Sequence, residues 1–239
     1  MNTVKFDRKL TRITAHRGVS GLETENTAAS FIAAGQRSYF GIETDIHFTK
    51  DGKYVCCHDS NLSRVSGEDI VIENITLSEL EKVCLYEKGT TEKRSYLRIP
   101  CLSDYISICK KYGKVCIAEI KGLMPEEHLV NIVNIFKSFE MLENTVFIAF
   151  DFDNLVVLRK LLPEQKLQYL TGRCDDETIA LLKKHNTDID IHHESLNEEN
   201  IRKLHAEGIE INCWTVDNKE RAELLASWGV DHITSNILE

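Results

Sequence analysis

The chain of 239 residues carries 38 acidic and 29 basic side chains, has a net charge of −9, and is 42% hydrophobic. This composition is that of a folded globular protein with enough apolar residues for a core, and it excludes a disordered chain. The basic residues are scattered, so nucleic acid is not an expected partner. No stretch approaches the roughly 20 apolar residues of a membrane span, and residues 1–9 contain no apolar leader segment. We therefore expect a cytoplasmic protein without stable membrane association.

Eight cysteines are distributed along the chain, and no two of them form a Cys-x-x-Cys pair. Most lie in apolar runs, which favours reduced, buried thiols over disulfides or a zinc site. A length of 239 residues is also usual for a single α/β barrel of about 250 residues. We expect one domain that spans residues 1–239.

The first strand is expected at residues 11–15, and it leads directly into His16, Arg17 and Gly18. Histidine exchanges protons near neutral pH, and the planar fork of arginine pairs with phosphate oxygens. Residues 28–35 have a helical composition, and Asn26 just before them is a candidate helix cap. The end of this strand is therefore a candidate catalytic position.

The run at residues 41–48 is rich in branched and aromatic residues and is expected to be a strand, so Glu43 and Asp45 share one face. Two neighbouring carboxylates repel each other unless a positive charge lies between them, and a hard divalent cation commonly fills that role. An exposed strand face would explain a single such pair. Glu119 and Lys121, however, form a second charged pair in an apolar and therefore buried strand, and buried charges need partners.

His58 follows a short strand at residues 53–57 that comes after an Asp51-Gly52 turn. Residues 59–100 are the least regular part of the chain, with a short helix expected at 76–83. We expect this segment to be a compact insertion that forms either a wall of a substrate cleft or a plain structural loop.

From residue 100 onward, helical and strand patterns alternate regularly. The expected helices span residues 102–112, 125–139, 153–162, 176–185, 197–207 and 219–228, and the expected strands 114–121, 145–150, 166–170, 187–191, 209–216 and 230–233. With the two early strands these make eight βα-type strands, which predicts an α/β fold of the TIM (β/α)8 barrel type. A doubly wound open sheet is the alternative, but no glycine-rich loop follows the first strand.

In such a barrel the chemistry lies at the carboxyl ends of the strands. Six polar or aromatic residues lie in or just after the ends of expected strands: His16, Glu43, Asp45, Glu119, Lys121 and Trp214. With His58 and Arg17 they supply the side chains that metal-assisted phosphoryl transfer requires.

Taken in order, these pieces closely resemble the glycerophosphodiester phosphodiesterase family. The matching segments are His16-Arg17-Gly18, Glu25-Asn26-Thr27, Glu43-x-Asp45, Thr49-Lys50-Asp51-Gly52, His58-Asp59 with Leu62 and Arg64, Glu119-Ile120-Lys121, and Trp214-Thr215-Val216. The resemblance covers almost the whole chain. It implies a TIM barrel that uses a divalent cation to hydrolyse glycerophosphodiesters to glycerol 3-phosphate and an alcohol.

The resemblance also implies a role for each site residue. His16 and His58 would be the catalytic acid and base, and Glu43, Asp45 and Glu119 would bind one cation, Mg²⁺ or Ca²⁺. The substrate, a small glycerophosphodiester, would be held by Arg17, Lys121 and Trp214. Two alternatives are a related phospholipase D-like or phosphatidylinositol phospholipase C-like enzyme and a non-catalytic phosphodiester-binding barrel. The head group and the oligomeric state stay open at this level.

Overall fold

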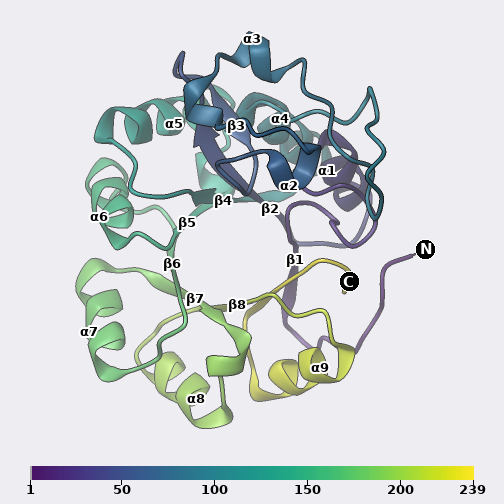
Figure 1. Ribbon diagram of the computed structural model, residues 1–239. Helices are drawn as coiled ribbons and strands as arrows, with labels where there is room; N and C mark the ends of the chain where they lie inside the picture. The colour runs from purple at the N-terminus through teal and green to yellow at the C-terminus, as the bar shows by residue number, and fades with distance from the viewer. Residues whose placement is uncertain (1) are drawn as a thin grey trace.

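The computed structural model describes residues 2–239, in which eight parallel strands close into a ring with helices around it (Figure 1). The strands of the ring are β1 (Arg12–Ala15), β2 (Gly41–Phe48), β4 (Val115–Ile120), β5 (Thr145–Ala149), β6 (Leu167–Thr171), β7 (Asp188–His192), β8 (Ile211–Trp214) and β9 (His232–Ser235). The ring closes because β1 pairs with both β9 and β2. The expected TIM barrel is confirmed.

The outer layer consists of the helices that connect successive strands. They are α1 (Ala28–Gly35), α4 (Leu102–Tyr112), α5 (Glu126–Ser138), α6 (Phe152–Leu161), α7 (Asp176–His185), α8 (Glu198–Ala206) and α9 (Lys219–Trp228), with single 3₁₀ turns at η2 (Leu142–Asn144) and η3 (His193–Ser195). Three of the predicted helices, α4, α7 and α9, have the expected bounds. The last strand instead begins two residues later than expected, because Gly229 ends α9 with a φ of 92° and the Val230 N–H still bonds to Leu225 of that helix.

Alternate side chains of each strand face the helices or the barrel interior. Outward-facing residues join the main core, where Phe31 of α1 packs edge-on against Tyr105 of α4 at 5.1 Å between ring centroids. A smaller apolar cluster of Ile117, Val146, Ile148 and Leu170 fills part of the barrel interior. The interior is thus packed with side chains, and the polar residues among them are the exceptions that need an explanation.

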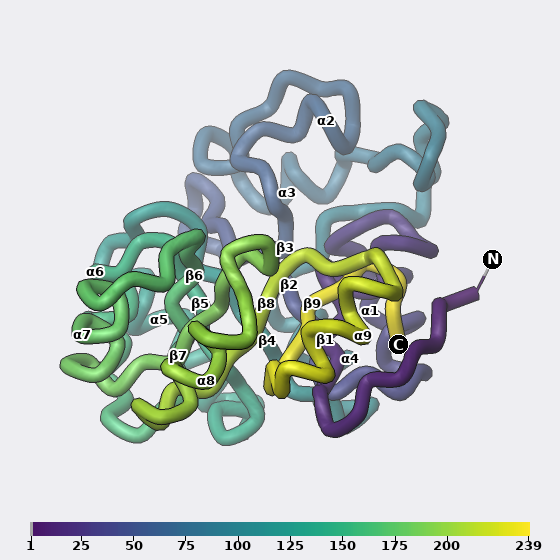
Figure 2. Tube along the Cα trace, turned by 90° about the horizontal axis from the view of Figure 1, so that it is seen from below, coloured from purple at the N-terminus to yellow at the C-terminus, as the bar shows by residue number. Residues whose placement is uncertain are grey.

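Residues 59–100 contain α2 (Ser63–Ser66), η1 (Ile72–Asn74) and α3 (Leu77–Leu80), preceded by the strand β3 (Tyr54–Cys56) that pairs antiparallel with β2. The segment has an apolar cluster of its own, which includes Leu62, Leu80 and Leu97. Figure 2 shows it standing out from the ring of helices on one side of the barrel. Among residues 2–239, no helix has both the length and the apolar character needed to cross a membrane.

Candidate active site

Three buried carboxylates meet at the carboxyl ends of two neighbouring strands. Glu43 and Asp45 come from β2 and Glu119 from β4, and Asp45 and Glu119 are direct partners in the strand register. One oxygen of each carboxylate lies within 4.8 Å of the others. The structure therefore brings together the three acidic residues that the sequence singled out.

The charge balance of this cluster is negative. The Lys121 Nζ lies 2.8 Å from Glu119 and 3.2 Å from Asp45, and the Arg17 Nε lies 3.6 Å from Asp45. Burial, and then repulsion from Asp45, raises the pKa of Glu119 to about 7 and moves the pKa of Glu43 well above its usual range. Burial would also raise the pKa of Asp45, but Lys121 and Arg17 outweigh it and lower that pKa to about 2. Two cations are too few for three buried carboxylates.

A divalent cation fits this donor set. All three groups offer carboxylate oxygens, which hard cations such as Mg²⁺ and Ca²⁺ prefer over the nitrogen and sulfur ligands typical of zinc. The Lys121 Nζ lies 3.2 Å from the buried Asp45 Oδ1 and is shared with Glu119, so this one cation serves two carboxylates. A bound divalent cation would supply the positive charge that the three buried carboxylates lack.

Asn26 holds the central carboxylate in place. Its side-chain amide donates to the Asp45 Oδ2 at 2.8 Å, and its amide oxygen accepts from the Thr44 hydroxyl at 2.7 Å. The sequence allowed Asn26 to be a helix cap, but Thr27 caps α1, while Asn26 itself has a φ of 51°. Asparagine tolerates this left-handed conformation better than most residues. Asn26 is thus a supporting residue of the carboxylate cluster.

His16 lies just after β1, and one of its ring nitrogens is fixed by a hydrogen bond. Its Nδ1 is 2.7 Å from the Asn236 Oδ1, and because the Asn236 amide nitrogen donates to Asp217, that oxygen accepts the imidazole proton. The free Nε2 lies 3.9 Å from Glu43. Burial, followed by the charge of Arg17, lowers the pKa of His16 to about 4, so the ring is neutral with an unshared pair on Nε2. The role of Asn236 escaped sequence analysis because its partner is 220 residues away.

His58 is oriented by a chain of ion pairs. The His58 Nδ1 lies 2.6 Å from Asp59, and Arg64 of α2 donates to the same carboxylate at 2.5 Å. Arg64 also binds both oxygens of Glu25, at 2.7 and 2.9 Å. Glu25 in turn accepts from the Arg17 guanidinium at 2.9 Å. The insertion therefore connects His58 with Arg17 through three charged side chains.

The backbone at Arg17 is shaped to hold Glu43. Arg17 has a φ of 52°, and its N–H donates to the Glu43 Oε2 at 2.7 Å. Gly18 follows at a φ of 74°, and a Cβ there would lie 2.4 Å from the Ser30 hydroxyl. Only glycine fits at this position, which accounts for the residue after Arg17.

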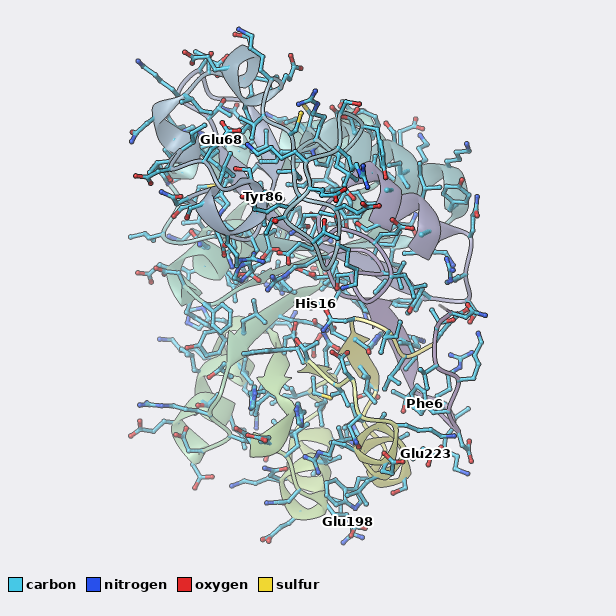
Figure 3. All side chains as sticks on the ribbon, turned by 45° about the vertical axis from the view of Figure 1, so that its right-hand side comes forward. Phe6, His16, Glu68, Tyr86, Glu198 and Glu223 are labelled. Atoms are coloured by element: carbon cyan, nitrogen blue, oxygen red, sulfur yellow. The ribbon has the colours of Figure 1, made fainter. Side chains whose placement is uncertain are left out.

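These groups line a cavity of about 140 Å³ at the barrel mouth. The charged or titratable residues of its wall are His16, Arg17, Glu43, His58, Glu119 and Asp190. The others are Ile148, Phe150, Leu170, Trp214, Thr215 and Thr234. In Figure 3, His16 lies between the insertion, marked by Glu68 and Tyr86, and the helices α8 and α9, marked by Glu198 and Glu223. Trp214, which the sequence suggested as an apolar wall, packs edge-on against Phe150 at 5.5 Å. Asp190 was not foreseen.

Comparisons with known proteins agree with this geometry. The family model described as the Glycerophosphoryl diester phosphodiesterase family matches residues 16–238. A glycerophosphodiester phosphodiesterase of Caldanaerobacter subterraneus is 29% identical and aligns with 95% of this chain and 94% of its own. One of Bacillus subtilis is 26% identical over 98% of this chain and 86% of its own.

Solved structures show the same fold. An Oleispira antarctica phosphodiesterase, in complex with the product sn-glycerol-3-phosphate, has a TM-score of 0.88 at 25% identity and covers 98% of this chain and 96% of its own. A glycerophosphodiester phosphodiesterase of Parabacteroides distasonis has a TM-score of 0.79 at 26% identity, with 95% and 93% covered.

Proposed function

The chain belongs to the glycerophosphoryl diester phosphodiesterase family, and we propose that it hydrolyses glycerophosphodiesters to glycerol 3-phosphate and an alcohol. The observation that carries this proposal is the buried cluster of Glu43, Asp45 and Glu119, together with two oriented imidazoles that line the same cavity. The cluster has two cationic partners, Lys121 and Arg17, for three carboxylates, and it borders a cavity; both facts support a cation-binding role over a purely structural one.

Glu43, Asp45 and Glu119 are proposed to hold one divalent cation, Mg²⁺ or Ca²⁺. When bound, the cation supplies positive charge to the phosphoryl oxygens. Asn26 keeps Asp45 in position for this role through its 2.8 Å hydrogen bond. The Arg17 N–H does the same for Glu43 at 2.7 Å.

His16 and His58 are the proposed proton-transfer groups. Because the His16 Nδ1–H donates a hydrogen bond to the Asn236 Oδ1, the Nε2 is an acceptor and suits the base that receives a proton from the attacking water. Asp59 beside the His58 Nδ1 fixes the orientation of the ring, which leaves the Nε2 to serve as the acid that protonates the leaving alkoxide. Each transfer of this kind contributes about 10²–10⁴-fold to the rate.

Arg17 and Lys121 are proposed to hold the phosphate, and Trp214 to cover the organic part of the substrate. The phosphodiester gains negative charge on its non-bridging oxygens as the nucleophile adds, so fixed cations favour the transition state over the ground state. Both cations are mostly buried, with side chains 18% and 16% exposed, so water screens their field only weakly.

Phosphorus NMR of the products tests the proposal. The wild-type protein should convert glycerophosphocholine, glycerophosphoethanolamine and glycerophosphoglycerol to glycerol 3-phosphate with Mg²⁺ or Ca²⁺, and a chelator should stop the reaction. His16→Ala and His58→Ala should each lose about 10²–10⁴-fold in kcat and keep the wild-type thermal midpoint. Release of phosphocholine, or hydrolysis by the metal-free protein, would refute the proposed reaction.

A further inference from the structure

A buried carboxyl group with no assigned role forms part of the cavity wall. Asp190 on β7 is only 2% exposed, and its Oδ1 has no hydrogen-bond partner among residues 2–239. No lysine, arginine or histidine of the described chain lies within ion-pair distance of it. Asp190 is separate from the cluster of three carboxylates. A buried polar atom of this kind costs stability and needs a functional explanation.

Asp190 has a polar neighbour on one side, its register partner Asn212 of β8, and apolar residues on the other. Its partner in the register of β6 is Leu170, and Ile148 and Phe150 line the same part of the cavity. Trp214 donates its indole N–H to the Asp190 backbone carbonyl at 3.1 Å, so the ring and the carboxyl group keep a fixed relation. Asp190 is the one carboxyl group among these apolar side chains, and Thr215 and Thr234 are the other polar residues that line the cavity near Trp214 and β9.

The electrostatics decide which part of a phosphodiester fits here. Burial raises the pKa of Asp190 well above its usual range, which favours the protonated form of the carboxyl group. A protonated carboxyl offers one O–H donor and one acceptor oxygen. Both a donor and an acceptor suit neighbouring hydroxyl groups, whereas a phosphate would find no cation at this wall.

We propose that Asp190 binds the hydroxyl groups of the substrate's glycerol moiety and thereby selects glycerol esters over simple alkyl esters. This inference rests on the proposed hydrolysis of glycerophosphodiesters. The carbon chain of the glycerol would contact Leu170 and Trp214, while its phosphate lies toward Arg17 and Lys121. The 140 Å³ cavity suits a three-carbon unit. The competing occupant is a cationic head group, which would require an ionised carboxylate beside the aromatic rings.

Two substrates with one leaving group separate these possibilities. Glycerol 3-(p-nitrophenyl phosphate) and n-propyl p-nitrophenyl phosphate differ only in the two hydroxyl groups. We expect the wild-type enzyme to prefer the glycerol ester by about 10–100-fold in kcat/KM, the range expected when a buried polar group loses its partner. Asp190→Leu should remove this preference and leave hydrolysis of the propyl ester within about threefold. Asp190→Asn retains a donor and an acceptor and should keep most of the preference.

Asp188→Asn is the matched control. Asp188 lies on the same strand but accepts a backbone N–H from Glu210, at the other end of β7, and its substitution should leave the preference unchanged. Asp190→Leu should also raise the thermal midpoint, because it replaces a buried unpaired carboxyl with an apolar side chain. Equal losses on both esters would overturn the proposal, as would a wild-type enzyme that does not discriminate between them. Loss of selectivity only between choline and neutral head groups would assign Asp190 to the head group instead.

A binding measurement tests the role of Asp190 independently of the proposed hydrolysis. If the wild-type protein hydrolyses neither ester with Mg²⁺, Ca²⁺ or Mn²⁺, the proposed function fails, but the thermal shift caused by sn-glycerol 3-phosphate against propyl phosphate still probes Asp190. The wild-type protein should bind glycerol 3-phosphate about 10–100-fold more tightly than propyl phosphate. Equal affinities, or a difference that survives in Asp190→Leu, would refute the inference.

Discussion

Replacement of Arg64 by methionine should reduce catalysis far more than stability. Arg64 is about half exposed and donates three charge-assisted hydrogen bonds, one to Asp59 and two to Glu25. Because solvent screens such pairs, their loss should cost about 1 kcal/mol of unfolding free energy, or a fall of about 2–4 °C in the thermal midpoint. In this variant Asp59 would still bind His58 but would lose its contact with Arg64. Glu25 would retain only its contact with Arg17.

The catalytic effect should be larger, because small displacements of a proton donor are costly. A shift of about 1 Å in a catalytic group can cost about 10²-fold, so we expect kcat/KM on glycerophosphocholine to fall by about 10–100-fold in Arg64→Met. The loss should be smaller on a p-nitrophenyl ester, because p-nitrophenolate leaves with little help from an acid. A substrate-dependent loss would identify His58 as the group that Arg64 positions.

Arg94→Met provides the control for this experiment. Arg94 lies in the same insertion, is similarly exposed, and binds Glu87 and Glu92, none of which lines the catalytic cavity. Its substitution should lower the thermal midpoint by a similar amount and leave both substrates unaffected. Equal catalytic losses in the two variants, or a wild-type rate in Arg64→Met, would refute the positioning role.

Three further predictions follow from other contacts. Asn26→Ala removes the donor to Asp45 and should weaken cation binding by about 10–100-fold in titration calorimetry, with an unchanged affinity counting against the role of Asn26. Arg17→Lys should depress kcat/KM strongly, because lysine cannot reproduce a planar fork; intact specific activity would show that the charge only stabilises the barrel. The hydrogen bond from His232, against the opposing effect of burial, lowers the pKa of Glu210 to about 2, below the usual value of 4.5 for a glutamate. The stabilisation from Glu210 is therefore complete above pH 4.5 and lost as the pH falls toward 2, so in Glu210→Gln the midpoint should fall by about 2–4 °C at pH 7 and match wild type near pH 2.

Sequence periodicity was sufficient for the barrel because each strand and helix has its own local pattern. Residues 102–112 alternate with a helical period and end before Gly113, and the structure has α4 at the same bounds. The carboxylate cluster could also be predicted from the sequence, since the two-residue spacing of Glu43 and Asp45 places both on one face of β2. The remaining step, that β2 lies beside β4, follows from the barrel topology.

Long-range polar contacts could not be predicted from the sequence in the same way. Asn236 contacts His16 across 220 residues, and nothing in the local pattern around position 236 indicates that partner. Asp190 alternates with apolar residues and resembles any inward-facing strand position. His128 of α5 stacks on Phe48 at 4.1 Å and bonds to the Tyr54 hydroxyl, contacts that the helical pattern around it does not indicate. Such contacts depend on how separate elements pack, which the sequence pattern does not encode locally.

Calorimetric titration of the metal-free protein with Mg²⁺ and Ca²⁺ tests the central claim most directly, namely that Glu43, Asp45 and Glu119 form one cation site that hydrolysis requires. We predict one cation per chain for the wild-type protein and a loss of binding in both Glu43→Gln and Asp45→Asn, in parallel with the loss of glycerophosphocholine hydrolysis. Wild-type affinity in both variants, or full hydrolysis in the presence of a chelator, would contradict the account.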